Sequence, residues 1–310
     1  MYRLLCRCRY DVVHTYTAMP GFLGRIVARM AGIPVILHHQ AGWTVTSYSS
    51  VLERLFFTLL EYLAALASTK SLCVSHVIAQ QAQRLHTAPR RKLVTICNGI
   101  DPQRFISVSD KAIRIRTRRS LAIPEDHLVI GNTGRLVPEK DNETLIRSLL
   151  PLHSLIPESP FTLVLVGEGP ERENLENLAR SLGLSDKVLF LGFRKDIPAL
   201  LAAMDIFAYP SLREGLSISL LEAMAAAKFV VASSIPPNAE LIQPDSTGLL
   251  VPMKSPHHMA RAIAWFVQNP RLAQRLAMTA RHRVLAHYTL ERTLQEAWDL
   301  YRKMFKEKVV

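Results

Sequence analysis

Two glutamates stand eight residues apart in an otherwise apolar segment, REGLSISLLEAM, which runs from Arg213 to Met224. The segment follows DIFAYPS, an apolar run typical of a buried strand, and it continues as SISLLEAMAAAK, which predicts a helix. Glu214 is therefore expected in a strand-to-helix loop, and Glu222 on the first turns of the helix. Backbone N–H groups from Gly215 to Ser217 would point into the cleft beside this loop. Such an arrangement at a helix N-terminus binds anions, phosphate among them.

The same two carboxylates also have an ordinary interpretation. Ser219 precedes Glu222 by three residues, which is the spacing of a capping box, so Glu222 could serve only to cap the helix. Glu214 could be a solvated loop charge. The segment by itself leaves both interpretations open.

Two cations five residues apart, Arg135 and Lys140, lie in GNTGRLVPEKDNETLI, where a strand is predicted to lead into a helix. In such a loop they could grip a diphosphate, although a lone Arg and Lys are more often surface residues. The run LVLVGEGP puts Gly167 and Gly169 at another strand-to-helix turn. Arg172 stands where a dinucleotide fingerprint needs its third glycine, so the sequence does not support NAD binding.

Metal ligands are sparse in this sequence. It contains no P-loop and no Asp-x-Asp pair, so a diphosphate clamped by a metal ion is not expected. Cys6 and Cys8 could bind a metal ion, but the sequence has no second Cys or His pair at ligand spacing. We therefore expect no metal site and no bound cofactor. The charge of a leaving diphosphate would then be met by Arg135, Lys140 and the helix terminus.

Short apolar runs alternate with helical stretches along the chain, which predicts an α/β fold with two doubly wound parallel sheets. The runs are DVVHTY, PVILHH, SLCVS and KLVTICN, and then HLVIGNTG, FTLVLVG, KVLFLGF, DIFAYP, FVVAS and TGLLV. Ligands of such sheets bind beyond the carboxyl ends of the strands. Only four strands fit the first half, where about six are usual, so the first domain is expected to be incomplete. The expected domains are residues 1–110, residues 111–287, and a C-terminal helical segment, 288–310, that packs back toward the first domain.

The helices are predicted between these strands. They cover residues 21–31, 51–67, 76–86, 142–150, 171–182, 197–204, 219–227, 256–267 and 290–305. A basic helix with Arg114, Arg116, Arg118 and Arg119 leads into the second sheet.

The formal net charge of +12 is concentrated toward the ends of the chain. Residues 1–100 hold 11 Lys and Arg against 3 Asp and Glu. Basic ends could meet nucleic acid, an anionic membrane or a phosphorylated substrate, but no nucleic-acid-binding motif is present. The apolar helix LERLFFTLLEYLAALA could be core or could rest on a membrane surface. Without a signal peptide or a membrane span, we expect a cytoplasmic protein whose basic first domain could contact the membrane.

Five segments together resemble one enzyme family. They are NGID, GRLVPEKDNETLI, LVGEGP, VLFLGFRKDIPALLAAMDIFAYPS and EGLSISLLEAMA. From Asp11 onward the chain resembles retaining glycosyltransferases of the family 4 (glycosyl transferases group 1) type. That family includes bacterial lipopolysaccharide and exopolysaccharide enzymes. The resemblance implies the GT-B fold, with two Rossmann-like domains, and transfer of a sugar from a nucleotide sugar with retention of configuration.

The resemblance also implies roles for single positions. Glu214 would contact hydroxyls of the transferred sugar, Glu222 would hold the ribose, and Arg135 with Lys140 would neutralise the departing diphosphate. The other donor-binding positions that it implies are Gly134, Gly167, Gly192, Phe193, Arg194, Gly215, Leu216 and Ser217. Among these, residues 192–194 would line the base pocket. A phosphate oxygen of the leaving group, rather than a side chain, would assist the incoming hydroxyl.

The acceptor side departs from the family pattern. The resemblance places the acceptor on the first domain, near His38, His39 and Gly42, but Ala41 stands where the family commonly has a histidine. The glycine-rich loop that usually follows the first strand does not occur, so we expect a chain truncated at its N-terminus. The expected function is transfer from a UDP-sugar to a glycan or lipid-linked acceptor in cell-surface polysaccharide synthesis. The alternatives are a catalytically weak nucleotide-sugar-binding module that needs a partner chain, and a sugar-nucleotide epimerase of the same fold.

Overall fold

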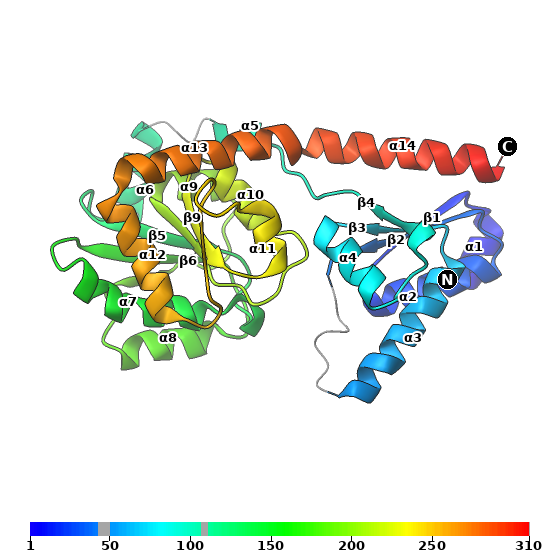
Figure 1. The fold of residues 1–310 in the computed structure, drawn as a ribbon, viewed down its shortest axis with the longest axis horizontal. Helices are drawn as coiled ribbons and strands as arrows, with labels where there is room; N and C mark the ends of the chain where they lie inside the picture. Colours follow the sequence, from blue (N-terminus) through cyan, green and yellow to red (C-terminus); the bar gives the residue numbers. More distant parts are fainter. Residues whose placement is uncertain (43–49, 107–110, 310) are drawn as a thin grey trace. The chain divides into compact units, whose positions relative to one another are not determined.

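The computed structural model describes residues 1–42, 50–106 and 111–309 (Figure 1). The chain forms two compact units: Met1–Asn98 with Leu290–Val310, and Gly99–Thr289. The domain boundary expected at residue 110 lies outside the described residues. In the described part, no helix is both long and apolar enough to cross a membrane.

The first unit is built on a parallel sheet with the strand order β1-β2-β3-β4. The strands are β1 (Val12–Tyr16), β2 (Val35–Gln40), β3 (Lys70–Cys73) and β4 (Leu93–Thr95). Its helices are α1 (Tyr2–Cys8), α2 (Ala18–Met30), α3 (Val51–Ala67), α4 (His76–Arg84), the 3-10 turn η2 (Arg90–Lys92) and α14 (Leu290–Val309). The four predicted strands are confirmed, because each apolar run of the first half forms one of them.

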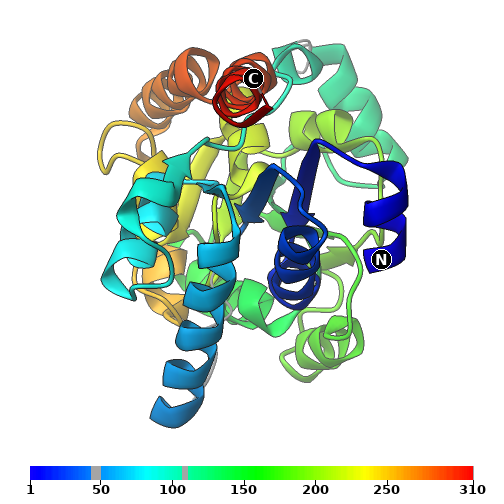
Figure 2. The ribbon, with the colours of Figure 1, turned by 90° about the vertical axis from the view of Figure 1, so that its right-hand side faces the viewer.

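Side chains of β2 alternate between two cores. Val35 and Leu37 face a cluster that includes Met304 of α14, whereas Ile36 joins Leu5 and other residues of α1 and α2. This alternation is the period of two of a strand with both faces covered. Figures 1 and 2 show α14 on one face of the sheet, with α2 and α3 on the other.

The second unit contains a parallel sheet with the order β10-β9-β8-β5-β6-β7. Its strands are β5 (Leu128–Thr133), β6 (Phe161–Val166), β7 (Val188–Phe190), β8 (Ile206–Tyr209), β9 (Phe229–Ser233) and β10 (Leu249–Val251). β5 pairs in parallel with both β6 and β8. Strands β6 and β7 are added on one side of β5 and strands β8 to β10 on the other, so the strand order reverses between β5 and β8. This is the strand order of a doubly wound dinucleotide-binding sheet, and β5/β8 is its topological switch point. The predicted α/β fold with two parallel sheets is confirmed.

Helices cover both faces of this second sheet (Figure 1). They are α5 (Gln103–Ile106), α6 (Lys111–Ser120), η4 (Pro138–Lys140), α7 (Asn142–Leu155), α8 (Arg172–Ser181), α9 (Ile197–Ala203), α10 (Ile218–Ala225), α11 (Pro236–Leu241), α12 (Pro256–Gln268) and α13 (Pro270–His287). Helix α13 is not among the helices predicted from the sequence. Its buried residues include three alanines and only one leucine, so its apolar stripe is weak in the sequence.

The basic helix α6 uses its charge within the fold. Arg118 is 1% exposed and donates hydrogen bonds to the backbone oxygens of Ala203, Glu125 and His127. Arg118 and Arg114 also bind the two oxygens of Asp205, at 2.7 and 2.6 Å. Half of the arginines that the sequence marks as a basic helix are therefore structural.

Candidate functional site

Lys140 and Glu214, 74 residues apart in the sequence, meet at the switch point of the second sheet. Lys140 ends η4 in the loop after β5, and Glu214 lies in the loop between β8 and α10. The Lys140 Nζ lies 2.5 Å from Glu214 Oε1. The two side chains are 17% and 11% exposed, so they form a half-sheltered ion pair that still reaches the surface.

Tyr209 and Ser211 complete this cluster. The Tyr209 hydroxyl donates to Glu214 Oε1 over 2.7 Å and accepts from Lys140 Nζ over 2.6 Å, while the Ser211 hydroxyl donates to the same Oε1 over 2.6 Å. Burial and the neighbouring Glu214 charge raise the pKa of Tyr209 well above its usual value. The phenol therefore stays protonated and keeps donating to the carboxylate. Among the described residues Glu214 Oε2 has no hydrogen-bond partner.

Neither Tyr209 nor Ser211 is among the site residues predicted from the sequence. Both belong to DIFAYPS, the strand that was predicted to enter this loop. Both residues carry a hydroxyl at the end of a buried strand beside the switch point. That position is the feature from which Tyr209 and Ser211 could have been predicted as site residues.

The helix after Glu214 begins one residue earlier than predicted. Ser217 caps α10, since its hydroxyl accepts a hydrogen bond from the backbone N–H of Leu220 over 3.2 Å. Ser219 is therefore inside the helix, and the capping-box interpretation of Ser219 and Glu222 is wrong. Glu222 stands on the second turn of α10 instead of at its cap.

Glu222 is half-buried, and its surroundings explain its electrostatics. Burial raises the pKa of Glu222, and the positive charge of Arg104 acts against this shift. Arg104 belongs to α5, which packs against α10. The Glu222 carboxylate does not cap the helix, and it is half-buried near one cation. It can therefore accept hydrogen bonds from neutral hydroxyl groups.

Three glycines bring the loops after β5, β6 and β7 together. The N–H of Gly134 donates to Val166 O over 2.9 Å, and the N–H of Gly167 donates to Gly192 O over 2.8 Å. A Cβ added to Gly167, whose φ is +139°, would lie 1.9 Å from the backbone oxygen of Gly134. Gly167 is thus required by backbone packing at the carboxyl edge of the sheet.

The remaining predicted donor residues differ in how available they are. Arg135 is exposed, and within the described residues it has no ion pair or side-chain hydrogen bond. Phe193 follows β7 and is 72% exposed. Arg194 is held by Asp196 through bonds of 2.8 and 2.6 Å, and this contact raises the pKa of Arg194. Arg135 and Phe193 are therefore open to a ligand, whereas Arg194 already has a counterion.

The acceptor-side residues lie in the first unit. His38 is 3% exposed, its Nδ1 lies 3.0 Å from the Thr15 hydroxyl, and burial together with the Arg25 charge lowers its pKa to about 3. It is a neutral core histidine. His39 is half-buried, with its ring 5.0 Å from that of Tyr16, and burial lowers its pKa as well. Gly42 is exposed. Of the three, only His39 and Gly42 reach solvent.

A second group on the same sheet was missed in the sequence. His14 Nδ1 lies 2.5 Å from the Tyr301 hydroxyl of α14, and the His14 ring stacks on Tyr16 at 4.6 Å. Burial and the neighbouring His39 lower the pKa of His14 to about 4. These aromatic side chains come from β1, β2 and α14, so no local pattern could have grouped them.

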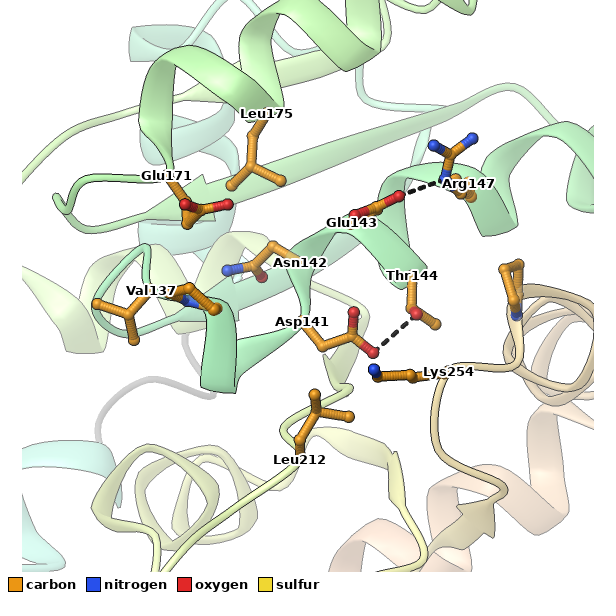
Figure 3. Close-up of a pocket in the computed structure, with 12 residues that line it drawn as sticks. Val137, Asp141, Asn142, Glu143, Thr144, Arg147, Glu171, Leu175, Leu212 and Lys254 are labelled. Carbon is orange, nitrogen blue, oxygen red and sulfur yellow. Dashed lines mark hydrogen bonds and ion pairs between the residues drawn. The ribbon is translucent and has the colours of Figure 1, made fainter. Parts of the chain in front are cut away.

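A pocket of about 460 Å³ lies beside the N-terminus of α7 (Figure 3). Asp141 accepts a hydrogen bond from the Thr144 hydroxyl there, and burial raises the Asp141 pKa. Lys254 faces Asp141, and the buried Asn142 Oδ1 has no partner among the described residues. None of the predicted site residues lines this pocket, so we assign the site to the Lys140–Glu214 cluster and not to the pocket.

The chemistry available at the cluster is that of anion and hydroxyl binding. Arg135 and Lys140 offer positive charge to a diphosphate, while Glu214 and Glu222 offer acceptors to sugar hydroxyls. In the described part of the second unit, no three His, Cys, Asp or Glu side chains lie close enough together to hold a metal ion.

Comparison with known families covers nearly the whole chain. The family described as Glycosyl transferases group 1 matches residues 113–283, and Glycosyltransferase Family 4 matches residues 1–104. The chain is 28% identical to the UDP-Gal:alpha-D-GlcNAc-diphosphoundecaprenol alpha-1,3-galactosyltransferase of Escherichia coli, over 99% of this chain and 79% of that one. It is also 28% identical to the putative glycosyltransferase EpsD of Bacillus subtilis, over 94% of this chain and 76% of the relative.

Solved structures share the fold. Anabaena Alr3699/HepE in complex with UDP has a TM-score of 0.83 at 23% identity, covering 97% of this chain and 82% of that one. Sucrose-phosphate synthase from Thermosynechococcus elongatus has a TM-score of 0.82 at 23% identity, covering 99% and 76%.

Proposed function

Since the chain belongs to the glycosyl transferases group 1 family, we propose that it transfers a sugar from a UDP-sugar to a lipid-linked acceptor. The observation that carries this proposal is the meeting of Lys140 and Glu214 at the β5/β8 switch point, where doubly wound sheets bind nucleotides. The UDP donor and the lipid-linked acceptor are supported by the name of the E. coli relative. We assign the product to cell-surface polysaccharide synthesis.

The two ends of the donor would be bound by the two glutamates. Glu214 is held in place through Oε1 by three donors, which leaves Oε2 to accept from hydroxyls of the transferred sugar. Glu222, on the next helix, would accept from the ribose hydroxyls. The exposed ring of Phe193 would stack on the base, which needs an aromatic face open to solvent.

The diphosphate would lie between these two carboxylates. Arg135 is exposed and Lys140 is half-sheltered, so both can reach an anion at the start of α10. The leaving diphosphate would draw Lys140 away from Glu214, because a phosphate carries more charge than one carboxylate. We propose that these cations, with the backbone of Gly215, Leu216 and Ser217, stabilise the leaving group without a metal ion.

We propose retention of configuration, with a phosphate oxygen of the donor assisting the acceptor hydroxyl. The acceptor would approach the first unit on the His39 and Gly42 side. A lipid-linked acceptor is anchored in a membrane, so the proposal includes peripheral contact of the first unit with the membrane from the cytoplasmic side.

Calorimetry tests the donor site directly. We would titrate UDP, GDP and ADP, each with and without a sugar, into the wild type, Glu222→Ala and Glu173→Ala. Glu173 is an exposed carboxylate on α8, so its removal is the matched control. We expect UDP to bind best, with affinity at least tenfold lower in Glu222→Ala and unchanged in the control. Equal binding of all three nucleotides, or the same loss in both variants, would contradict the assigned donor site.

Transfer is a separate question from binding. A UDP-sugar and an undecaprenyl-diphosphate-linked sugar would be incubated with the protein, and the anomeric configuration of the product would be read by NMR. An axial sugar delivered from an axial donor would support retention. Selective binding without transfer or hydrolysis would favour the alternative of a nucleotide-sugar-binding module, and a changed sugar without any acceptor would favour an epimerase.

A further inference from the structure

Helix α3 presents a continuous apolar face to solvent. The residues of this α3 face are Leu52 (78% exposed), Leu55 (63%), Phe56 (57%), Leu59 (56%), Leu63 (49%) and Leu66 (47%). They recur every three or four positions, so they lie on one side of the helix over about 21 Å. No charged residue interrupts the spacing.

The other side of α3 is fixed to the rest of the first unit. Ala64 and Ala65 are fully buried there. Glu61 binds Arg25 of α2 through two hydrogen bonds of 2.7 and 2.8 Å. A surface helix normally buries its apolar stripe and turns its charges to water. In α3 the charged Glu61 points inward to a buried arginine, and the leucines point outward.

The neighbouring helix α2 has a similar outward face. Met19, Leu23 and Met30 are 63%, 53% and 68% exposed, and their spacing of four and seven places them on one side of the helix. The two helices pack against each other on the same face of the sheet. The N-terminal end of α3 extends beyond the other elements of its unit in Figures 1 and 2. Exposed apolar residues therefore lie on two adjacent helices, and large exposed apolar patches are characteristic of interaction sites.

Positive charge lies at one end of the α3 face. The Lys92 ammonium donates to the backbone oxygens of Ala65, Leu66 and Ser68 at the C-terminus of α3. Arg90 and Arg91, which precede Lys92 in η2, are exposed. The basic turn is therefore attached to the end of the apolar helix.

We infer that the α3 face, flanked by η2, docks the first unit onto an anionic lipid bilayer, with α3 lying in the plane of the interface. Leucine and phenylalanine on one face and arginine beside them are the features of interfacial helices. Lys and Arg side chains near an anionic surface are attracted to it. A second copy of the chain would bring the same positive charges together, which opposes self-association. This inference rests on the proposed function, which places the acceptor in a membrane.

Flotation of the full chain with vesicles tests the inference without any sugar substrate. We would compare phosphatidylcholine vesicles with vesicles that contain about one third phosphatidylglycerol, for the wild type and for Leu55→Gln/Leu59→Gln. The control is Leu150→Gln/Leu272→Gln, which removes two leucines of the second unit that are 45% and 42% exposed. We expect the wild type and the control to float with anionic vesicles, and the α3 variant to bind at least tenfold more weakly, equivalent to about 1.4 kcal/mol.

The basic turn gives an independent readout. Arg90→Gln/Arg91→Gln should weaken binding to anionic vesicles about tenfold or more and leave any binding to phosphatidylcholine unchanged. Raised salt should reproduce that loss in the wild type. Equal flotation of the wild type and the α3 variant would overturn the inference, as would failure of the wild type to float.

Light scattering after gel filtration decides between a membrane and a second copy. A wild type that is dimeric and does not float, with a monomeric α3 variant, would assign the face to self-association. Calorimetry with UDP on the same preparations keeps the two proposals apart. Loss of flotation with intact UDP binding bears only on the membrane surface, and loss of UDP binding with intact flotation bears only on the donor site.

Discussion

The ion pair between Lys140 and Glu214 should make an energetic contribution that a double-mutant cycle can measure. Glu214 Oε1 accepts three hydrogen bonds, and the two side chains are 11% and 17% exposed. A hydrogen bond to a charged group contributes about 1.5–3 kcal/mol, and breaking a fully buried pair costs about 3–5 kcal/mol. Partial exposure places this pair toward the lower end of both ranges.

The two single variants should differ because their residual contacts differ. Glu214→Gln leaves the Lys140 ammonium without a carboxylate, so we expect the free energy of unfolding to fall by about 2.5 kcal/mol. Lys140→Met leaves Glu214 with the hydroxyls of Tyr209 and Ser211, so the fall should be about 1.5 kcal/mol. The double variant removes both charges and should also cost about 2.5 kcal/mol, which gives a coupling of about 1.5 kcal/mol.

Urea unfolding followed by the fluorescence of Trp265 would measure these values in the second unit. Trp265 stacks on Phe229 at 5.6 Å, and replacing Trp43 and Trp298 by phenylalanine leaves it as the sole reporter. The control is the cycle on Arg147→Met and Glu143→Gln. That surface pair is 46% and 57% exposed, so its coupling should be about 0.3–0.5 kcal/mol. A Lys140–Glu214 coupling no larger than the control would refute the argument that the two site residues hold each other.

Four further outcomes follow from three residues, Glu222, Gly167 and Arg118. The affinity for UDP should fall as the pH drops through the raised pKa of Glu222, because only the ionised carboxylate accepts two ribose hydroxyls. Titration calorimetry should show that the UDP affinity of Glu222→Gln does not change over the same pH range. Because the pKa of Glu222 is raised in the folded protein, protonated Glu222 stabilises the fold, and this stability is lost as the pH rises through that pKa. At pH 7, Glu222→Gln should therefore unfold at a higher urea concentration than the wild type. Gly167→Ala should cost more than about 3 kcal/mol in urea unfolding, since its Cβ meets a backbone oxygen at 1.9 Å, whereas Gly183→Ala has open space and should cost about 1 kcal/mol. Arg118→Met should lower stability by about 3–5 kcal/mol, while the exposed Arg116→Met should change it by less than about 0.5 kcal/mol.

The strands could be predicted from the sequence because each is a short apolar run buried on both faces. All ten predicted runs form strands of the two sheets. Helix ends were less predictable. The sequence predicts that the helix from Asn142 ends at Leu150, but α7 continues through Pro151 to Leu155. Leu149 and Leu152 are fully buried on either side of the proline, so tertiary packing outweighs the missing backbone hydrogen bond.

The candidate site could be predicted only in part, since it is assembled by the sheet order. The sequence indicates that Lys140 and Glu214 each follow a strand, but it does not say that β5 pairs with β8. That pairing brings the two side chains within 2.5 Å. The fixed partners Tyr209 and Ser211 carry no motif. The same limit applies to Arg194. The sequence places Asp196 two residues later, but it does not predict that the two side chains form an ion pair.

Net charge is the feature that the sequence describes least well, because charges of one sign have different roles in the fold. Arg118 binds Asp205 and three backbone oxygens, and Arg25 forms an ion pair with Glu61. These arginines add to the formal charge of +12 but are not available to an outside partner. The exposed arginines of η2 are, and they adjoin the apolar α3 face. Any anionic partner of the first unit should therefore respond to neutralisation of Arg90 or Arg91 and not to neutralisation of the buried Arg25.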